Sequence, residues 1–327
     1  MTSMGVVEIR VGLLVFPQTL RSAIFGLIEF FETAGGMSER YPSPVRWVCE
    51  AYLDEPHPVA LGVPSRRLLK RNARLDVVVV PPLSGPLEGD DVPAAALSWL
   101  VDQSKRGVVL CSSCVGAYVL ASGGLLDGRR ATTHWMLAQD FRSRFPSVDL
   151  VDEHIVVDEG DIITAGGVTA WLDLALLLCA RFASPALAAA MGKYYLVDTG
   201  LREQRFYRLF LPSFSHGDDA ILRLQRWLQR EYTSRLTSEE LARQAGMSER
   251  TLHRRFSEAT GATPHRYLTR LRLSKACERL EVSRDPLEQI CGDVGYDDPA
   301  SFRKLFKREM GLSPAAYRRR FSGSNLR

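Results

Sequence analysis

Two cysteines lie three residues apart in the stretch VVLCSSCVGAYVLASGG, residues 108–124, where an apolar run passes into a helical pattern. Thiols in such a place are typical of four kinds of site: a redox pair, half of a metal site, a catalytic nucleophile or a ligand pocket. A C-x-x-C redox pair needs both cysteines at the start of the helix, whereas Cys111 falls in the apolar run. We therefore expect Cys111 to be a small core hydrophobe, and the role of Cys114 stays open at this point.

A metal site would need two further ligands near the two thiols. No second C-x-x-C and no H-x-x-x-H is present, and His57, His134 and His154 are scattered along the chain. We expect no metal and no cofactor. The six cysteines occur in segments that resemble core segments of a long chain, which favours buried thiols over a disulfide framework.

A second set of residues that suggest chemistry belongs to an internal repeat in the last third of the chain. The stretch LARQAGMSERTLHRRFSEATGATPHRY, residues 241–267, aligns with ICGDVGYDDPASFRKLFKREMGLSPAAY, residues 290–317, with one extra residue in the second copy. The aligned pairs are Gly246 with Gly295, Phe256 with Phe306, Gly261 with Gly311, Pro264 with Pro314 and Tyr267 with Tyr317. Each copy predicts a short helix, a turn at the first glycine and a second helix that ends at the next glycine, which is a helix-turn-helix.

The second helix of each copy is expected to turn basic side chains away from its core face. Leu252 and Phe256 form that core face in the first copy, and Phe302, Leu305 and Phe306 form it in the second. The outward residues are Arg250, His253, Arg254, Ser257, Ala300, Arg303, Lys304 and Lys307. Because Arg and Lys suit guanine edges and phosphates and a small Ala can contact a thymine methyl, we expect these residues to bind DNA. A plain helical bundle would not require a turn glycine and a basic outer face in both copies.

The charge distribution agrees with a polyanionic partner for this part of the chain. From residue 216 to the end, Lys and Arg outnumber Asp and Glu by 22 to 15, whereas residues 1–215 carry 23 acidic and 20 basic residues. A basic part that follows a mildly acidic part suggests that the second part binds nucleic acid. The N-terminal residues do not resemble a signal peptide and no segment is apolar enough to span a membrane, so we expect a cytoplasmic protein without a membrane partner.

The elements that must position Cys114 alternate between strands and helices. Residues 11–16 and 76–82 are apolar enough for strands that are buried on both faces, and residues 22–36 and 92–107 have helical spacing and end in glycine. Residues 153–167 indicate a strand pair, and residues 169–182 a buried helix. We expect an α/β, flavodoxin-like fold whose mainly parallel sheet is sandwiched by helices. A nucleotide-binding Rossmann domain is the alternative, but no G-x-G-x-x-G follows the first strand.

These patterns divide the chain into three parts. We expect an α/β domain over residues 1–190, a linker over residues 191–219 and an all-α DNA-binding domain with two helix-turn-helix units over residues 220–327. The linker contains a cluster of Pro, Ser, Gly and Asp at residues 212–219, which is typical of a domain boundary.

The two repeats and the helix between them resemble the DNA-binding domain of the AraC/XylS family of bacterial transcription regulators. The family's second-unit signature is present as GYDDPASFRKLFKREMGLSPAAYR, residues 295–318. The chain departs from the family at Cys291, where a small Ala is usual, and at Pro299 early in the second recognition helix. Neither departure conflicts with the fold, since Pro is accepted in a first helical turn.

The stretch SSCVGAYVLASGGLLDGRRATTHW, residues 112–135, resembles the nucleophile elbow of the class I glutamine amidotransferase-like superfamily, in particular its PfpI-like branch. The resemblance places Cys114 on a tight strand-to-helix turn beside Val115 and Gly116, brings His134 to the same site, and implies that the helix N-terminus lowers the pKa of the thiol. The branch has an acidic residue near the start of the first helix, where this chain has Ala23.

These observations predict a transcription regulator in which a non-catalytic PfpI-like domain binds a small-molecule effector at Cys114, Val115, Gly116 and His134. The expected partners are promoter DNA, RNA polymerase, the effector and a second copy of the chain. The alternative is a cysteine-dependent hydrolase or lyase, or a thiol redox sensor, fused to a DNA-binding module.

Overall fold

The computed structural model describes residues 6–41, 43–53, 65–67, 74–85, 92–199, 203–208 and 210–323. The chain divides into two compact units, Met1–Gln204 and Arg205–Arg327. Among the described residues, no helix is both long and apolar enough to cross a membrane.

The first unit is built on a seven-stranded sheet with the strand order β3-β2-β1-β4-β5-β9-β8. The strands are β1 (Val7–Val15), β2 (Val45–Leu53), β3 (Ser65–Arg67), β4 (Val77–Val80), β5 (Val109–Ser113), β8 (Val156–Asp158) and β9 (Ile162–Ala165). All pairs are parallel except β8 with β9, which is the expected strand pair. The four valines of β4 are completely buried, as expected for a strand that is covered on both faces.

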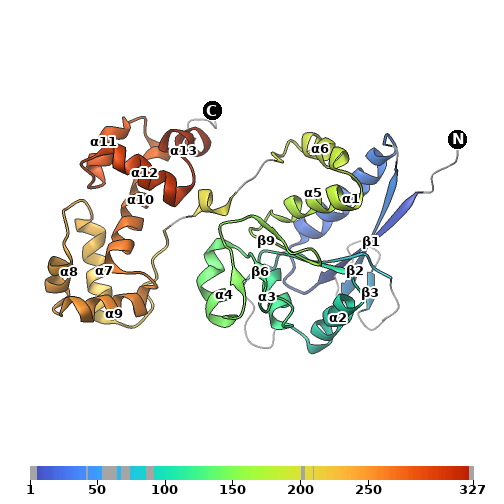
Figure 1. Ribbon diagram of the computed structural model, residues 1–327, viewed down its shortest axis with the longest axis horizontal. Helices are drawn as coiled ribbons and strands as arrows, with labels where there is room; N and C mark the ends of the chain where they lie inside the picture. The colour runs from blue at the N-terminus through green and yellow to red at the C-terminus, as the bar shows by residue number, and fades with distance from the viewer. Residues whose placement is uncertain are drawn as a thin grey trace. The chain divides into compact units, whose positions relative to one another are not determined.

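Helices cover both faces of this sheet (Figure 1). One core contains side chains of α1 (Arg21–Ser38), α5 (Trp171–Phe182) and α6 (Pro185–Tyr194). The other contains side chains of α2 (Ala94–Lys105), α3 (Gly116–Ser122) and α4 (Ala138–Arg144). A second, two-stranded sheet pairs β6 (Arg130–Ala131) with β7 (Asp149–Leu150). The expected parallel sheet between helices is confirmed.

One helix end differs from the expectation. The first helix was expected to end at the glycine pair of residues 35 and 36, but α1 continues to Ser38. The Ser38 hydroxyl donates to the Gly35 carbonyl at 2.6 Å and accepts from the Val45 amide at 2.9 Å. These bonds tie the last turn of the helix to the start of β2, so the glycines do not end it.

Among the described residues of the second unit, all regular elements are helices, and the first is a short 3₁₀ helix, η2 (Gln204–Tyr207), that begins at the last residue of the first unit. Its helices are α7 (Asp219–Glu231), α8 (Ser238–Ala245), α9 (Glu249–Thr260), α10 (Pro264–Val282), α11 (Leu287–Asp293), α12 (Pro299–Met310) and α13 (Pro314–Phe321). The pairs α8–α9 and α11–α12 are the two expected helix-turn-helix units, each with its own buried core.

Local sequence explains where these helices begin and end. Side chains at the N-caps of α8, α9, α10, α12 and α13 accept backbone hydrogen bonds, and the cap residues are Thr237, Ser248, Thr263, Asp298 and Ser313. Gly246 and Gly295 both have positive φ, at +67° and +80°, which explains why glycine occupies the turn of each repeat. The extra residue of the second copy lies between Gly295 and the cap of α12.

Candidate functional site

Cys114 directly follows β5 and adopts a backbone conformation that L-residues rarely use. Its φ is +56°, and its amide donates to the Ala165 carbonyl of β9 at 2.7 Å. Val115 forms the N-cap of α3, and Gly116 begins the helix so close to β4 that a Cβ would lie 2.5 Å from the Val80 carbonyl oxygen. The strand-to-helix turn therefore requires glycine at residue 116 and presents Cys114 at the carboxyl edge of the parallel sheet.

The thiol of Cys114 is protonated at neutral pH. Burial raises its pKa to about 11 and outweighs the lowering effect of hydrogen bonds from the backbone of Val115 and Gly167. The Val115 amide at the helix N-terminus does lower this pKa, as predicted, but the net pKa is raised, because the side chain is 4% exposed and desolvation of the thiolate outweighs these hydrogen bonds. A protonated thiol is a weak nucleophile.

Cys111 and Cys114 do not face each other. Cys111 is fully buried in the core between the sheet and the helices α1 and α5, whereas Cys114 packs in the core on the opposite face. Both are free thiols, and burial raises the pKa of Cys111 as well. The geometry therefore offers no dithiol pair, and Cys111 is the core residue that the sequence predicted.

His134 caps the 3₁₀ helix η1 (Trp135–Leu137), and its Nδ1 accepts from the Met136 amide at 3.1 Å. Burial lowers the pKa of its imidazole, so the ring is neutral at pH 7 and carries its proton on Nε2. The neighbouring Thr133 makes the connection to the elbow, since its hydroxyl donates to the Cys114 carbonyl at 2.8 Å. His134 and Cys114 thus belong to two segments that Thr133 ties together.

Ala23, which the resemblance aligned with the family's acidic residue, is completely buried in α1. The nearest acidic residue along the helix, Glu29, is exposed. The first helix therefore supplies no carboxylate close to its start.

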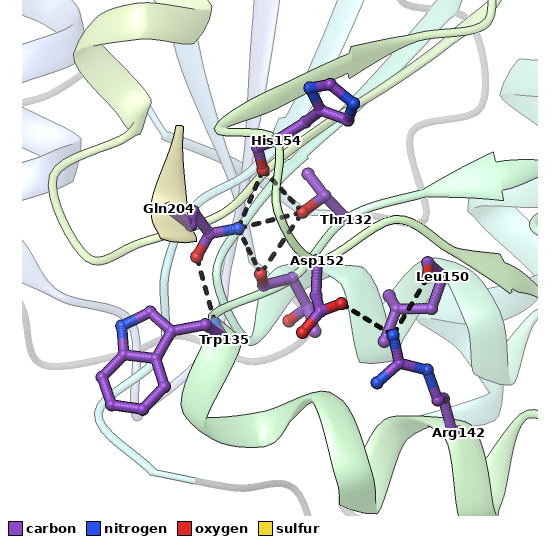
Figure 2. Close-up of polar contacts among 8 residues, drawn as sticks. Thr132, Trp135, Arg142, Leu150, Asp152, His154 and Gln204 are labelled. Atoms are coloured by element: carbon purple, nitrogen blue, oxygen red, sulfur yellow. Dashed lines mark hydrogen bonds and ion pairs between the residues drawn. The ribbon is translucent and has the colours of Figure 1, made fainter. Parts of the chain in front are cut away.

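Three buried polar residues that sequence reasoning missed support the segment that carries His134 (Figure 2). Thr132 and Thr133 are fully buried, and Gln204 is 3% exposed. The Gln204 side chain donates to Thr132 and Thr133 and accepts from the Trp135 amide. Thr132 and Thr133 stand in the polar stretch DGRRATTHW, residues 127–135, so their burial had no signal in the sequence. Nothing in the sequence around Gln204 pairs it with a segment about 70 residues away.

In the second unit, the predicted DNA-binding residues lie on the outer faces of α9 and α12. Six of them are exposed and two, His253 and Ser257, are half-buried; the exposed ones are Arg250, Arg254, Ala300, Arg303, Lys304 and Lys307. Two of these cations have acidic neighbours: Arg254 pairs with Glu258 at 3.2 Å and Arg303 with Glu288 at 2.6 Å. All four partners are largely exposed, so these pairs are weak and can exchange for phosphate or base contacts.

Arg255, which follows Arg254 in α9, has a different role. Its guanidinium donates to both carboxylate oxygens of Asp218, the N-cap of α7, at 2.9 and 2.7 Å. The pair fixes the recognition helix to α7, so Arg255 positions the helix that carries Arg254.

Comparison with known proteins assigns both units. Residues 68–181 match the DJ-1/PfpI family and residues 241–320 match a helix-turn-helix domain family. The HTH-type transcriptional regulator CdhR of Pseudomonas aeruginosa is 30% identical over 225 residues, which cover 68% of this chain and 67% of CdhR. The regulator ArgR of the same organism is 29% identical over 97% of this chain and 94% of its own length. The regulator GlxA of Rhizobium meliloti is 31% identical over 68% of each chain.

The chain belongs to the family of HTH-type transcriptional regulators in which a DJ-1/PfpI domain precedes an AraC-type helix-turn-helix domain. Both resemblances drawn from the sequence are confirmed.

Proposed function

We propose that this regulator binds promoter DNA through α9 and α12 and that its first unit senses a small molecule at Cys114, Val115, Gly116 and His134. The observation that carries the proposal is the pair of capped recognition helices whose apolar residues are buried and whose basic residues face outward. In this proposal the bound chain acts as a homodimer in the cytoplasm and changes the access or activity of RNA polymerase.

The outer faces of the two helices suit base reading. Arg254 and Lys304 can reach guanine edges, His253 can donate or accept, and Ala300 is small enough to contact a thymine methyl. Arg250 and Lys307 lie where phosphate contacts are expected. The helix α10 links the two helix-turn-helix units. It has 19 residues and a length of about 28 Å, which is comparable to the roughly 34 Å between successive major grooves.

The elbow favours ligand binding over catalysis. The Cys114 thiol has a pKa of about 11, burial lowers the pKa of His134, and the Nδ1 of His134 is occupied by the Met136 amide. A cysteine nucleophile needs a thiolate or an adjacent base, and Cys114 and His134, as they are held here, supply neither. The opposite faces of Cys111 and Cys114 argue equally against a disulfide switch between them.

DNA selection followed by substitution tests the DNA-binding part. The full chain selects fragments from a random library, and Arg254→Ala is compared with Arg319→Ala in α13. Loss of a bidentate base contact should cost Arg254→Ala about 1–3 kcal/mol on the selected fragment but little on random DNA. Arg319→Ala should weaken both DNAs alike. Equal losses on both DNAs for Arg254→Ala would remove this residue from base reading.

A thermal-shift screen of metabolites tests the sensing part, since a ligand of the folded state raises the melting temperature. For a bound metabolite, Cys114→Ser should retain the shift and His134→Ala should reduce it. Turnover of the metabolite that disappears in Cys114→Ser would establish the enzymatic alternative instead.

A further inference from the structure

We propose that Gln204 is a positioning residue that couples the site at Cys114 and His134 to the chain segment from which the DNA-binding unit begins. The inference rests on the proposed function, because it assumes that the first unit senses a ligand. Gln204 is the last residue of the first unit.

One buried amide holds three separate segments of the first unit together (Figure 2). The Nε2 of Gln204 lies 3.0 Å from the Thr132 hydroxyl, 2.9 Å from the Thr133 carbonyl oxygen and 2.8 Å from the His154 carbonyl oxygen. Its Oε1 accepts from the Trp135 amide at 3.0 Å. The residues on both sides of His134 are therefore bonded to the same side chain.

The backbone around Gln204 is fixed as well. Its amide donates to the Glu153 carbonyl at 2.7 Å, and Glu203 forms a β-bridge with His154. The loop that receives these bonds is itself held, since Arg142 donates to Asp152 at 2.7 Å and to the Leu150 carbonyl at 3.2 Å.

The side chain of Gln204 is packed tightly against the backbone of Gly166. A Cβ at residue 166 would lie 2.0 Å from Nε2 of Gln204, so only glycine is accommodated there. Because Gln204 is 3% exposed, loss of its Oε1 bond to Trp135 or of both its N–H bonds would leave a buried polar group without a partner, at a cost of about 1–3 kcal/mol. A shift of Thr133 or Trp135 must therefore either move Gln204 with it or break these hydrogen bonds at that cost in free energy.

The path from the elbow to Gln204 is short. The Thr133 hydroxyl donates to the Cys114 carbonyl, and the Thr133 carbonyl accepts from Gln204. A ligand that displaces Cys114 or the His134 segment thus acts on Gln204 through a single intervening residue.

The chain reaches an anchor in the second unit directly after Gln204. Phe206 is 7% exposed, and its ring lies 2.5 Å from where a Cβ of Gly311 would stand at the end of α12. Arg320 of α13 lies over the rings of Phe206 and Tyr207 and donates to the Tyr207 hydroxyl at 2.8 Å. Only Arg205 separates Gln204 from Phe206, so the chain between these two residues spans at most about 7 Å.

A double-mutant cycle on the full chain tests the coupling without a known ligand. Cys114→Met serves as the perturbation of the site, and the probe is a DNA fragment selected from a random library by the wild-type chain. We expect Cys114→Met alone to change the Kd for this fragment about fivefold or more. In a Gln204→Met background the same substitution should change the Kd by less than about twofold.

Gln103→Met provides the matched control, because Gln103 of α2 is 2% exposed in the same unit and its Oε1 has no hydrogen-bond partner among the described residues. The fivefold effect of Cys114→Met should persist in that background. A similar effect in the Gln204→Met and wild-type backgrounds, or no effect of Cys114→Met in the wild type, would overturn the coupling. A wild-type chain that selects no DNA would instead refute the proposed function.

A second pair of variants covers the case in which Gln204→Met does not fold. Thr133→Val removes the hydroxyl that reaches Cys114, and Thr133→Ser keeps it. The coupling predicts that the effect of Cys114→Met disappears in Thr133→Val and is retained in Thr133→Ser. Equal effects in both variants would overturn the proposed path.

Discussion

The chemistry of Cys114 follows from its surroundings more than from its position in the motif. The turn with φ of +56° and the close approach of Gly116 to β4 are features of a nucleophile elbow. The same turn buries the thiol between the sheet and α3, and this burial raises its pKa to about 11. The elbow is therefore formed, but its thiol is not activated.

The alkylation rate of Cys114 should report this directly. With a pKa of about 11, roughly one thiol in ten thousand is ionised at pH 7, and the ionised fraction rises about tenfold per pH unit. The rate of iodoacetamide addition, located by tandem mass spectrometry, should therefore keep rising up to at least about pH 10. A rate that is already at its plateau near pH 7 would indicate a thiolate and would support the alternative of a cysteine-dependent enzyme.

At the scale of elements, the position of α9 depends on a contact that lies outside the DNA-binding surface. The Arg255 side chain joins the recognition helix to the N-cap of α7, and its hydrogen bonds hold the pKa of Asp218 below its usual range. The two adjacent arginines thus have different roles: Arg255 holds α9 against the N-terminus of α7, and this position of α9 directs Arg254 outward.

The pH dependence of the melting temperature should show the contribution of the Arg255–Asp218 pair to stability. Because the pKa of Asp218 is lower in the folded chain than in the unfolded chain, the pair stabilises the fold above about pH 4 and loses this contribution as the pH falls further. Arg255→Ala should lower the melting temperature of the second unit at pH 6 and make it less sensitive to acidification from pH 5 to pH 3. Arg254→Ala, which removes only an exposed pair, should leave the acid profile unchanged.

The second unit should fold by itself, provided that its first aromatic residues are retained. A fragment of residues 205–327 keeps Phe206 on Gly311 and Phe210 at 4.9 Å from the ring of Tyr267, whereas a fragment of residues 217–327 loses both contacts. Both fragments should be helical by circular dichroism, and the longer one should melt at a higher temperature. Identical melting curves would mean that the 205–216 segment contributes nothing to this fold.

For the whole molecule, periodic features were predictable and pairwise contacts were not. The alternation of valine-rich runs with helical patterns predicted the parallel sheet, and the turn glycines at residues 246 and 295 predicted both helix-turn-helix units. The burial of Cys111 followed from its place in a strand. The raised pKa of Cys114 did not follow, because desolvation depends on what packs over the turn.

The missed residues share one property. Gln204 bonds to the Thr132–Trp135 segment and Arg255 bonds to Asp218 across gaps of about 70 and 37 residues, and no local spacing marks such pairs. A buried glutamine or an arginine within a basic helix resembles a solvated side chain until the fold brings its partner close.

In the proposed function, both recognition helices of one chain read DNA. Hydroxyl-radical footprinting of the isolated 205–327 fragment on its selected DNA tests this most directly, since one unit is then present per site. We expect two protected stretches about ten base pairs apart, of which Lys304→Ala weakens one and Arg254→Ala the other. A single protected stretch that both substitutions weaken equally would contradict it.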